Sequence, residues 1–140
     1  MNELRMTFYE FESFKTFRGC ISCHLQKVMP REHIWVETAL NEAVNNAFKH
    51  GQKRKANAPI SINMKVLNGK RLVIRVKDSG DGFCVADVLK YSGKYFSDED
   101  LLDESGRGLK IMLQVMDVVK YNVLGNEVLL VKRLSDQEVI

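Results

Sequence analysis

Apolar residues recur at two spacings along the chain, and each spacing predicts a different kind of element. A spacing of three to four residues predicts a helix that starts near Ser13 and ends near Pro30. Its buried face would hold Phe14, Phe17, Ile21, Leu25 and Val28. The same spacing predicts a second helix over residues 31–50, which Gly51 would close as a C-terminal cap. Its apolar side would hold Ile34, Leu40, Val44, Ala47 and Phe48.

A period of two predicts strands, because successive side chains of a strand point to opposite faces of a sheet. Residues 5–11 alternate in this way, and so do the residues on both sides of Asn68-Gly69, a strong hairpin turn. Two last strands are expected over residues 118–124 and 127–134, after a helix over residues 109–116. Residues 84–105 show only weak patterning, so we expect a mobile segment there.

The predicted order is strand, helix, helix, strand, strand, loop, helix, strand, strand. Helices that pack on one face of a mainly antiparallel, mixed sheet form an α+β two-layer sandwich. The chain has 140 residues, which suits a single domain over residues 1–140.

Composition is ordinary for a globular protein, with 45% hydrophobic and 28% charged residues. A net charge of +3 is too small to favour a nucleic-acid partner. The basic run after the second helix (Lys49, Lys53, Arg54 and Lys55) suits a solvated helix end, or the steering of an anionic ligand. No apolar run approaches the roughly 20 residues of a membrane span, and charges interrupt the N-terminus where a signal would lie. We therefore expect a cytoplasmic protein that does not enter a membrane.

Three cysteines are too few for a secreted disulfide scaffold. The run Cys20-Ile21-Ser22-Cys23-His24 matches the c-type haem attachment pattern, but that chemistry requires export. A redox or zinc pair is a second interpretation. The third, which the helical spacing favours, is a pair of small buried residues on a helix.

Glu42 and Asn46 form the first candidate chemical element. They are four residues apart on the second helix and so project from one face, with His50 one turn further on. A carboxylate beside an amide oxygen suits a hard cation such as magnesium, and the carboxylate could also accept a proton from a hydroxyl. The alternative is a polar helix face in solvent.

The segment Asp78-Ser79-Gly80-Asp81-Gly82-Phe83 is the second element. An Asp at the end of a strand can accept a hydrogen bond from the exocyclic amine of a base. Gly80 and Gly82 would let the backbone pass close to a flat ring. A loop rich in turn residues is the alternative.

The segment Ser105-Gly106-Arg107-Gly108-Leu109 is the third element. Glycines at a helix N-terminus expose backbone N–H groups to phosphate, and Arg107 could add a charged contact. Taken alone, the segment is equally typical of an ordinary helix start.

In their order and spacing the three elements resemble the nucleotide-binding boxes of the GHKL superfamily, which includes gyrase, heat-shock chaperones, histidine kinases and MutL. Its histidine-kinase-like ATP-binding domains have a Bergerat-type α+β fold. The whole chain resembles the compact serine kinases that act as anti-sigma factors. The boxes are residues 41–51, 78–83 and 104–109, with Met116-Asp117 after the third. One departure is Asn126-Glu127, where relatives often carry Thr.

The resemblance implies a role for each candidate residue. Asn46 would coordinate magnesium and Glu42 would be the catalytic carboxylate. Asp78 would hold the adenine amine. The remaining nucleotide contacts would come from His50, Gly80, Gly82, Phe83, Gly106, Arg107, Gly108 and Leu109. Residues 84–105 would form the lid.

The resemblance also implies an activity and its partners. The activity would be an ATP- and Mg²⁺-dependent serine/threonine protein kinase that acts as an anti-sigma factor. Its substrate would be a STAS-type anti-anti-sigma protein, and its other partner would be a sigma factor. The kinase itself would form a homodimer. The alternative is an ATP-responsive binding module without phosphotransfer.

Overall fold

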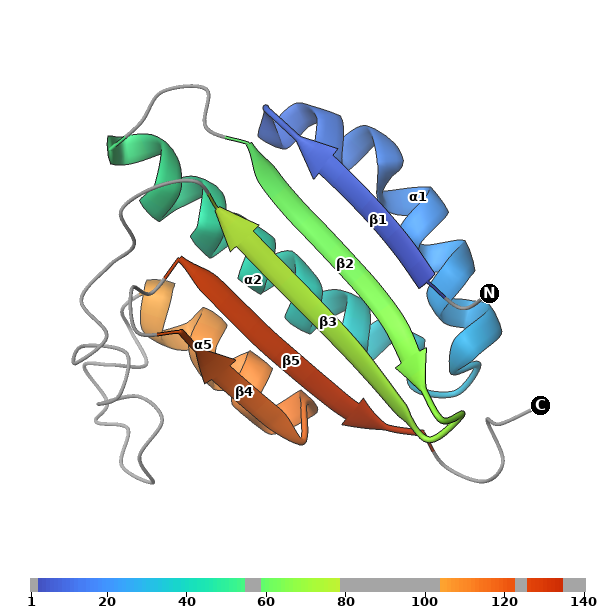
Figure 1. Cartoon of the computed structure of the whole chain (residues 1–140). Helices are drawn as coiled ribbons and strands as arrows, with labels where there is room; N and C mark the ends of the chain where they lie inside the picture. Colours follow the sequence, from blue (N-terminus) through green and yellow to red (C-terminus); the bar gives the residue numbers. More distant parts are fainter. Residues whose placement is uncertain (1–2, 55–58, 79–103, 123–125, 135–140) are drawn as a thin grey trace.

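Five strands form one sheet in the computed structural model, which describes residues 3–54, 59–78, 104–122 and 126–134. The strands are β1 (Glu3–Phe8), β2 (Ile60–Leu67), β3 (Arg71–Asp78), β4 (Val118–Tyr121) and β5 (Glu127–Arg133). Their order across the sheet is β1-β2-β3-β5-β4, and every described pairing is antiparallel (Figure 1). The last strand in sequence, β5, therefore lies between β3 and β4.

The hairpin between β2 and β3 forms where the sequence predicts it. Asn68 and Gly69 both have positive φ, at 55° and 67°, and three residues, 68–70, connect the paired residues Leu67 and Arg71. The N–H of Lys70 donates to the carbonyl of Leu67 at 2.9 Å and closes the turn. This turn sets the register in which Ile60 pairs with Asp78 at the far end of the hairpin.

Three described helices lie on one face of this sheet: α1 (Phe11–Val28), α2 (His33–Arg54) and α5 (Glu104–Val115). Figure 1 shows all three behind the strands, with α2 between α1 and α5. The predicted α+β two-layer sandwich with helices on one face is confirmed. Within the described residues, no helix is long and apolar enough to cross a membrane.

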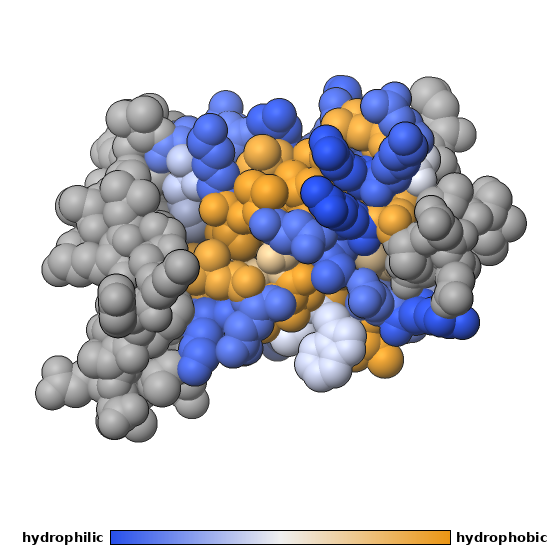
Figure 2. All heavy atoms as spheres, turned by 90° about the horizontal axis from the view of Figure 1, so that it is seen from below, coloured by the Kyte–Doolittle hydropathy of each residue, from blue (hydrophilic) through white to orange (hydrophobic). Residues whose placement is uncertain are grey.

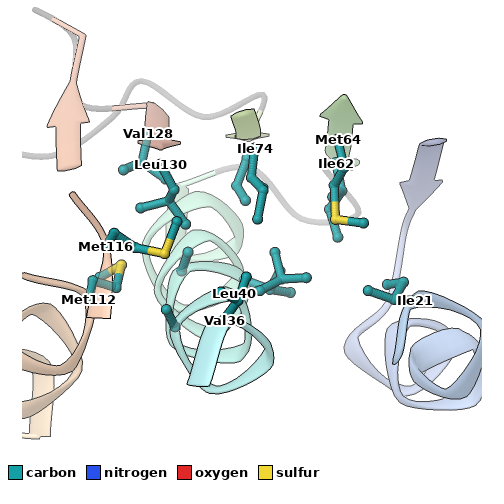
Figure 3. Packing of buried hydrophobic residues seen from close by; sticks show 14 of the residues in the cluster. Ile21, Val36, Leu40, Ile62, Met64, Ile74, Met112, Met116, Val128 and Leu130 are labelled. Carbon is teal, nitrogen blue, oxygen red and sulfur yellow. The ribbon is translucent and has the colours of Figure 1, made fainter. Parts of the chain in front are cut away.

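The core fills the space between the sheet and the helices. Figure 3 shows Ile62, Met64 and Ile74 pointing from the strands towards Leu40 of α2, and all four are almost completely buried. The alternating strand pattern explains this, because every second side chain of β2 and β3 faces the helices. Burying a side chain of this size contributes about 1.5–3 kcal/mol.

Several boundaries differ from the sequence prediction: β1 ends at Phe8 and not at residue 11, and α1 already begins at Phe11. The largest differences are at two helix ends. Helix α2 continues through Gly51 to Arg54, and α5 begins at Glu104 and not at Leu109. Glycine can adopt helical dihedrals at a cost of roughly 0.5–1 kcal/mol, so its presence alone does not end a helix.

Four residues predicted to be buried on helices are exposed. Ile34 is 63% exposed and Phe17 is 50% exposed. Cys20 and Cys23 are exposed and carry free thiols, so the interpretation as buried small residues is wrong. In α2 the buried positions include Val36, Ala39 and Ala43. Leu40, Val44 and Phe48 of the predicted apolar side are buried, so the prediction for α2 fails at its first residue, Ile34.

The other face of the sheet carries no described helix. Side chains from the end of β2, from β3, β4 and β5, and from Asp117 before β4 line a hollow: Leu67, Arg71, Val73, Arg75, Asp117, Val118, Leu129, Val131 and Arg133. The hollow combines aliphatic side chains with arginines. Figure 2 looks from below at an edge of the sandwich and not at this face; hydrophobic residues gather there in the middle, between hydrophilic ones.

Candidate functional site

The centre of the candidate site lies where α2 and α5 pack against each other. Glu42 and Asn46 project from α2 towards Gly108 of α5. A methyl group built on Gly108 would lie 2.7 Å from Oε2 of Glu42 and 3.7 Å from Nδ2 of Asn46. The predicted pair of polar side chains therefore faces the third glycine-rich element and not open solvent.

This arrangement fits a magnesium ion in its donor chemistry. Carboxylate and amide oxygens are the ligands that Mg²⁺ prefers, usually in small number because the ion keeps several waters. Glu42 and Asn46 bring one oxygen donor group each, and the missing side chain at Gly108 keeps α5 close to both. The residues present are therefore able to hold the ion together with phosphate oxygens.

Asp78 and Asn46 line the same small pocket, although they come from the sheet and from α2. The pocket is lined by Ala43, Asn46, Ala47, Val76, Asp78, Tyr121, Asn126, Glu127 and Val128. Apolar walls around a few polar groups are typical of sites that bind a flat heterocycle. The structure thus brings the first and second predicted elements together.

Asp78 is only 3% exposed, and among the described residues it is the only charged side chain in the buried class. Burying a carboxylate is costly unless it is hydrogen-bonded, so proteins reserve such positions for a purpose. The N–H of Asp78 donates to the carbonyl of Asn126 at 2.9 Å, which fixes the end of β3 against β5. The carboxylate is therefore held on a rigid part of the sheet.

Asn126 is held in turn by Asn122. The Asn122 amide donates to Oδ1 of Asn126 at 2.6 Å, and the N–H of Asn126 donates back to Oδ1 of Asn122 at 3.0 Å. Asn126 and Glu127 lie in the wall of the pocket together with Asp78. The position at which the resemblance noted a departure thus belongs to the same pocket as Asp78.

Tyr121 is a site residue that the sequence did not single out. It lines the same pocket as Asn46. Burial raises the pKa of Tyr121 to about 12. The phenol therefore stays neutral at physiological pH. Nothing in the alternation of β4 marks Tyr121 as different from an ordinary strand residue.

The other predicted site residues divide into three groups. Gly80, Gly82 and Phe83 lie outside the described residues, as does most of the expected lid over residues 84–105. His50, Gly106 and Arg107 lie within helices whose backbone alone is described at these positions. Leu109 is buried in the hydrophobic core, where it anchors α5 beside Gly108.

The cysteine pair does not form a metal site with its neighbours. Cys20, Cys23 and His24 lie on α1, and no group of three or more His, Cys, Asp or Glu residues suited to a metal ion occurs in the described part of the chain. His24 faces inward instead. Its Nε2 is buried and has no hydrogen-bond partner among the described residues.

Comparisons with known proteins agree with this site. Residues 10–132 match the histidine kinase-like ATPase domain family. The chain is 34% identical over 105 residues to the serine-protein kinase RsbW of Staphylococcus aureus strain bovine RF122. The matched region covers 72% of this chain and 65% of that protein. It is also 34% identical over 90 residues to the serine-protein kinase RsbW of Bacillus licheniformis. That match covers 63% of this chain and 56% of the relative.

A third relative is the anti-sigma F factor of Clostridium botulinum strain Eklund 17B, 32% identical over 82 residues, covering 59% of this chain and 55% of that protein. The chain thus spans between about half and two thirds of the length of these relatives. The family match itself includes Glu42, Asn46, Asp78 and Gly108. On this evidence, the chain belongs to the histidine kinase-like ATPase domain family.

Proposed function

We propose that this protein is an ATP-dependent serine/threonine protein kinase that acts as an anti-sigma factor. The observation that carries the proposal is the convergence of Glu42 and Asn46 on Gly108, beside the pocket that holds Asp78. A site of this kind offers a carboxylate that can accept the proton of a substrate hydroxyl. It also offers oxygen atoms that can bind a cation, and a buried carboxylate that can accept a hydrogen bond from a nucleotide base. The names of the relatives, a serine-protein kinase and an anti-sigma factor, support the same activity.

In this proposal Asp78 recognises adenine. A buried carboxylate accepts the hydrogen bond of the exocyclic amine, and the surrounding apolar walls receive the ring. Gly80, Gly82 and Phe83 would complete the contact with the base. A base that presents an acceptor in place of the amine would face the carboxylate without a hydrogen bond, so adenine is preferred over guanine.

The N-terminal turn of α5 would bind the phosphates. The first N–H groups of a helix have no partner within the helix and favour an anion. Because α5 begins at Glu104, these groups belong to residues around Gly106 and not to Leu109. Arg107 would add a charge-assisted contact. His50, four residues after Asn46 in the sequence, completes the set of proposed nucleotide contacts.

The chemical step follows from the place of Glu42. The hydroxyl oxygen of the substrate Ser or Thr forms a bond with the γ-phosphorus of ATP while the bond to the ADP oxygen breaks. Glu42 accepts the hydroxyl proton, and ADP leaves with the electron pair. Magnesium, when bound with ATP, would neutralise charge on the phosphates. Asn46 would hold that ion through Oδ1.

The protein substrate in this proposal is a STAS-type anti-anti-sigma protein, and a sigma factor is the second partner. Both follow from the resemblance to anti-sigma kinases and from the name of the anti-sigma F factor relative. Such a switch operates in the cytoplasm, where ATP and the transcription machinery are found.

We also propose a homodimer, formed through the uncovered face of the sheet. Leu67 and Val118 are 41% and 43% exposed there, beside the aliphatic side chains of the hollow. Light scattering should give the mass of a dimer for the wild type and that of a monomer for Val118→Asp. Ile34→Asp, an exposed position on the helix side, should leave the dimer intact. A monomeric wild type would contradict the dimer.

Labelled ATP tests the kinase proposal. The protein is incubated with [γ-³²P]ATP and magnesium, alone and with a purified STAS partner. Transfer of label to Ser or Thr of the partner, abolished by removing magnesium, is the expected result. Binding of the partner only in the presence of nucleotide, without transfer, would replace the kinase with an ATP-responsive binding module.

A further inference from the structure

Asn122 and Asn126 lie opposite each other where β4 ends and β5 begins. β4 ends at Tyr121 and β5 begins at Glu127, so each Asn lies one residue outside its strand. In Figure 1 the start of β5 lies beside the arrowhead of β3, and the last residue of β3 is Asp78. The backbone at Asn126 therefore connects this end of β4 with the nucleotide pocket.

The side chain of Asn122 makes three hydrogen bonds across this end of the two strands. Its Oδ1 accepts from the N–H of Asn126 at 3.0 Å and from the N–H of Glu127 at 3.2 Å. Its Nδ2 donates to Oδ1 of Asn126 at 2.6 Å. One side chain therefore holds both the backbone and the side chain of Asn126.

Asp78 is fixed by the same stretch of backbone. Its N–H donates to the carbonyl of Asn126 at 2.9 Å, one step beyond the last pair of the β3–β5 register, Lys77 and Glu127. Because Asn126 lies outside β5, the bonds from Asn122 help to place its carbonyl. A chain of hydrogen bonds thus runs from Asn122 through Asn126 to the buried Asp78.

We propose that Asn122 is a positioning residue for the recognition of adenine, and that it acts by fixing Asp78 through Asn126. The inference rests on the proposed function, because it assumes that Asp78 accepts the hydrogen bond of the adenine amine. Asn122 is not among the described residues that line the pocket of Asp78, so it acts through another residue and not by contact with the base. It also lies outside the three elements that the sequence singled out.

The physical reason is the geometry of the hydrogen bond to the base. Such a bond weakens steeply when donor and acceptor move out of line. A carboxylate that distinguishes one base from another must therefore keep its place, and Asp78 stands at the very end of its strand. The neighbouring start of β5, held by Asn122, supplies the support that the end of β3 needs.

Asn122→Ala tests the inference with two nucleotides, ATP and purine riboside triphosphate, which differs from ATP only in lacking the exocyclic amine. Calorimetry should show that the wild type prefers ATP by roughly 10-fold or more, the usual effect of a hydrogen bond to a charged group. In Asn122→Ala this preference should fall by about 2- to 10-fold, the effect of a neutral hydrogen bond, because Asp78 is less well aligned. Affinity for purine riboside triphosphate should change little. The single-turnover rate of phosphotransfer at saturating ATP should stay at the wild-type value, because Glu42 and the start of α5 are unaltered.

Three further variants frame this result. Asn122→Asp keeps the oxygen that accepts from the N–H groups of Asn126 and Glu127, so it should retain most of the preference for ATP. Asn63→Ala removes an amide of β2 that donates to Glu3 at 3.2 Å, and it should leave the preference unchanged. Asp78→Asn should bind both nucleotides weakly and alike.

The possible failures are distinguishable. If the wild type binds no ATP, or binds both nucleotides equally well, the proposed function of Asp78 is wrong and the inference falls with it. If the wild type and Asp78→Asn behave as expected but Asn122→Ala keeps the full preference, only the positioning role is wrong. An equal loss of affinity for both nucleotides would also overturn this role, because Asn122 would then support the pocket as a whole.

A measurement on the wild type covers the case in which Asn122→Ala does not fold. The side-chain amide signals of Asn122 in an ¹⁵N NMR spectrum are compared between the complexes with ATP and with purine riboside triphosphate. Different positions of these signals would support the connection between Asn122 and the adenine amine. Identical positions would contradict it.

Discussion

Gly108 and Glu42 approach so closely that a single methyl group cannot fit between them. The Cβ of an alanine at position 108 would lie 2.7 Å from Oε2 of Glu42, nearer than such atoms can come. The atom that must give way is the end of a flexible side chain and not backbone. The contact therefore limits where Glu42 can point.

Gly108→Ala should separate stability from activity. Alanine inside a helix is more favourable than glycine by roughly 0.5–1 kcal/mol, so thermal unfolding should stay the same or move to a higher temperature. Phosphotransfer should fall by about 10²-fold, because Glu42 is displaced from its place beside the phosphate site. Both are measured on one preparation, by calorimetric unfolding and by transfer of label.

Gly19→Ala is the matched control. Gly19 also lies inside a helix, α1, and nothing stands within 4 Å of the position that a Cβ would take. The substitution should bring a similar gain in stability with unchanged phosphotransfer. A loss of activity in both variants would show that helix stiffening, and not the contact with Glu42, is the cause.

The β2–β3 hairpin and the placement of Asp78 could be predicted because their signals are local. Alternation fixes which side chains of β3 face the helices, and Asn68-Gly69 fixes the register. Tyr121 could not be found in this way. Its place in the same pocket as Asn46 depends on the position of β5 between β3 and β4, which brings residues 75 positions apart into one pocket. Ile34 shows a smaller failure, since periodicity placed Leu40, Val44 and Phe48 of α2 correctly but not this residue near the start of the helix.

Asp78→Asn should abolish tight nucleotide binding while the fold persists. The amide keeps the shape of the carboxylate but replaces an acceptor by a group that also donates, facing the adenine amine. A lost hydrogen bond to a charged group costs about 1.5–3 kcal/mol, which corresponds to roughly 10- to 150-fold in affinity. Calorimetric titration with ATP measures this. Asp117→Asn, an exposed Asp at the other end of β4, should bind ATP normally, and normal binding by Asp78→Asn would refute the adenine assignment.

His24 should make the protein less stable in mild acid. Burial lowers the pKa of His24 below its usual value near 6.5, and the charge of Lys27 adds to this. The unfolded chain therefore takes up the proton first, so stability is complete above about pH 6.5 and falls as the pH decreases through that value. Urea unfolding at pH 7.5 and at pH 5.5 measures the loss, which should be smaller in His24→Leu. An equal loss in both proteins would assign the acid sensitivity to other groups.

Glu42→Gln separates the kinase from a nucleotide-dependent binding switch. The amide preserves the size of the side chain and its contact with Gly108, but it cannot accept the hydroxyl proton. Affinity for ATP should stay nearly unchanged or rise slightly, because a negative charge near the triphosphate is lost. Phosphotransfer should fall by about 10²–10⁴-fold, the usual scale for general-base catalysis. Some transfer should remain, since Asn46 and the start of α5 still align the phosphates.

Single-turnover transfer to the STAS partner measures the rate, and calorimetry measures the affinity. If Glu42→Gln transfers phosphate as fast as the wild type, Glu42 is not the general base. If the wild type itself transfers no label, yet binds the partner only when ATP is present, the protein is a nucleotide-dependent binding switch without catalysis.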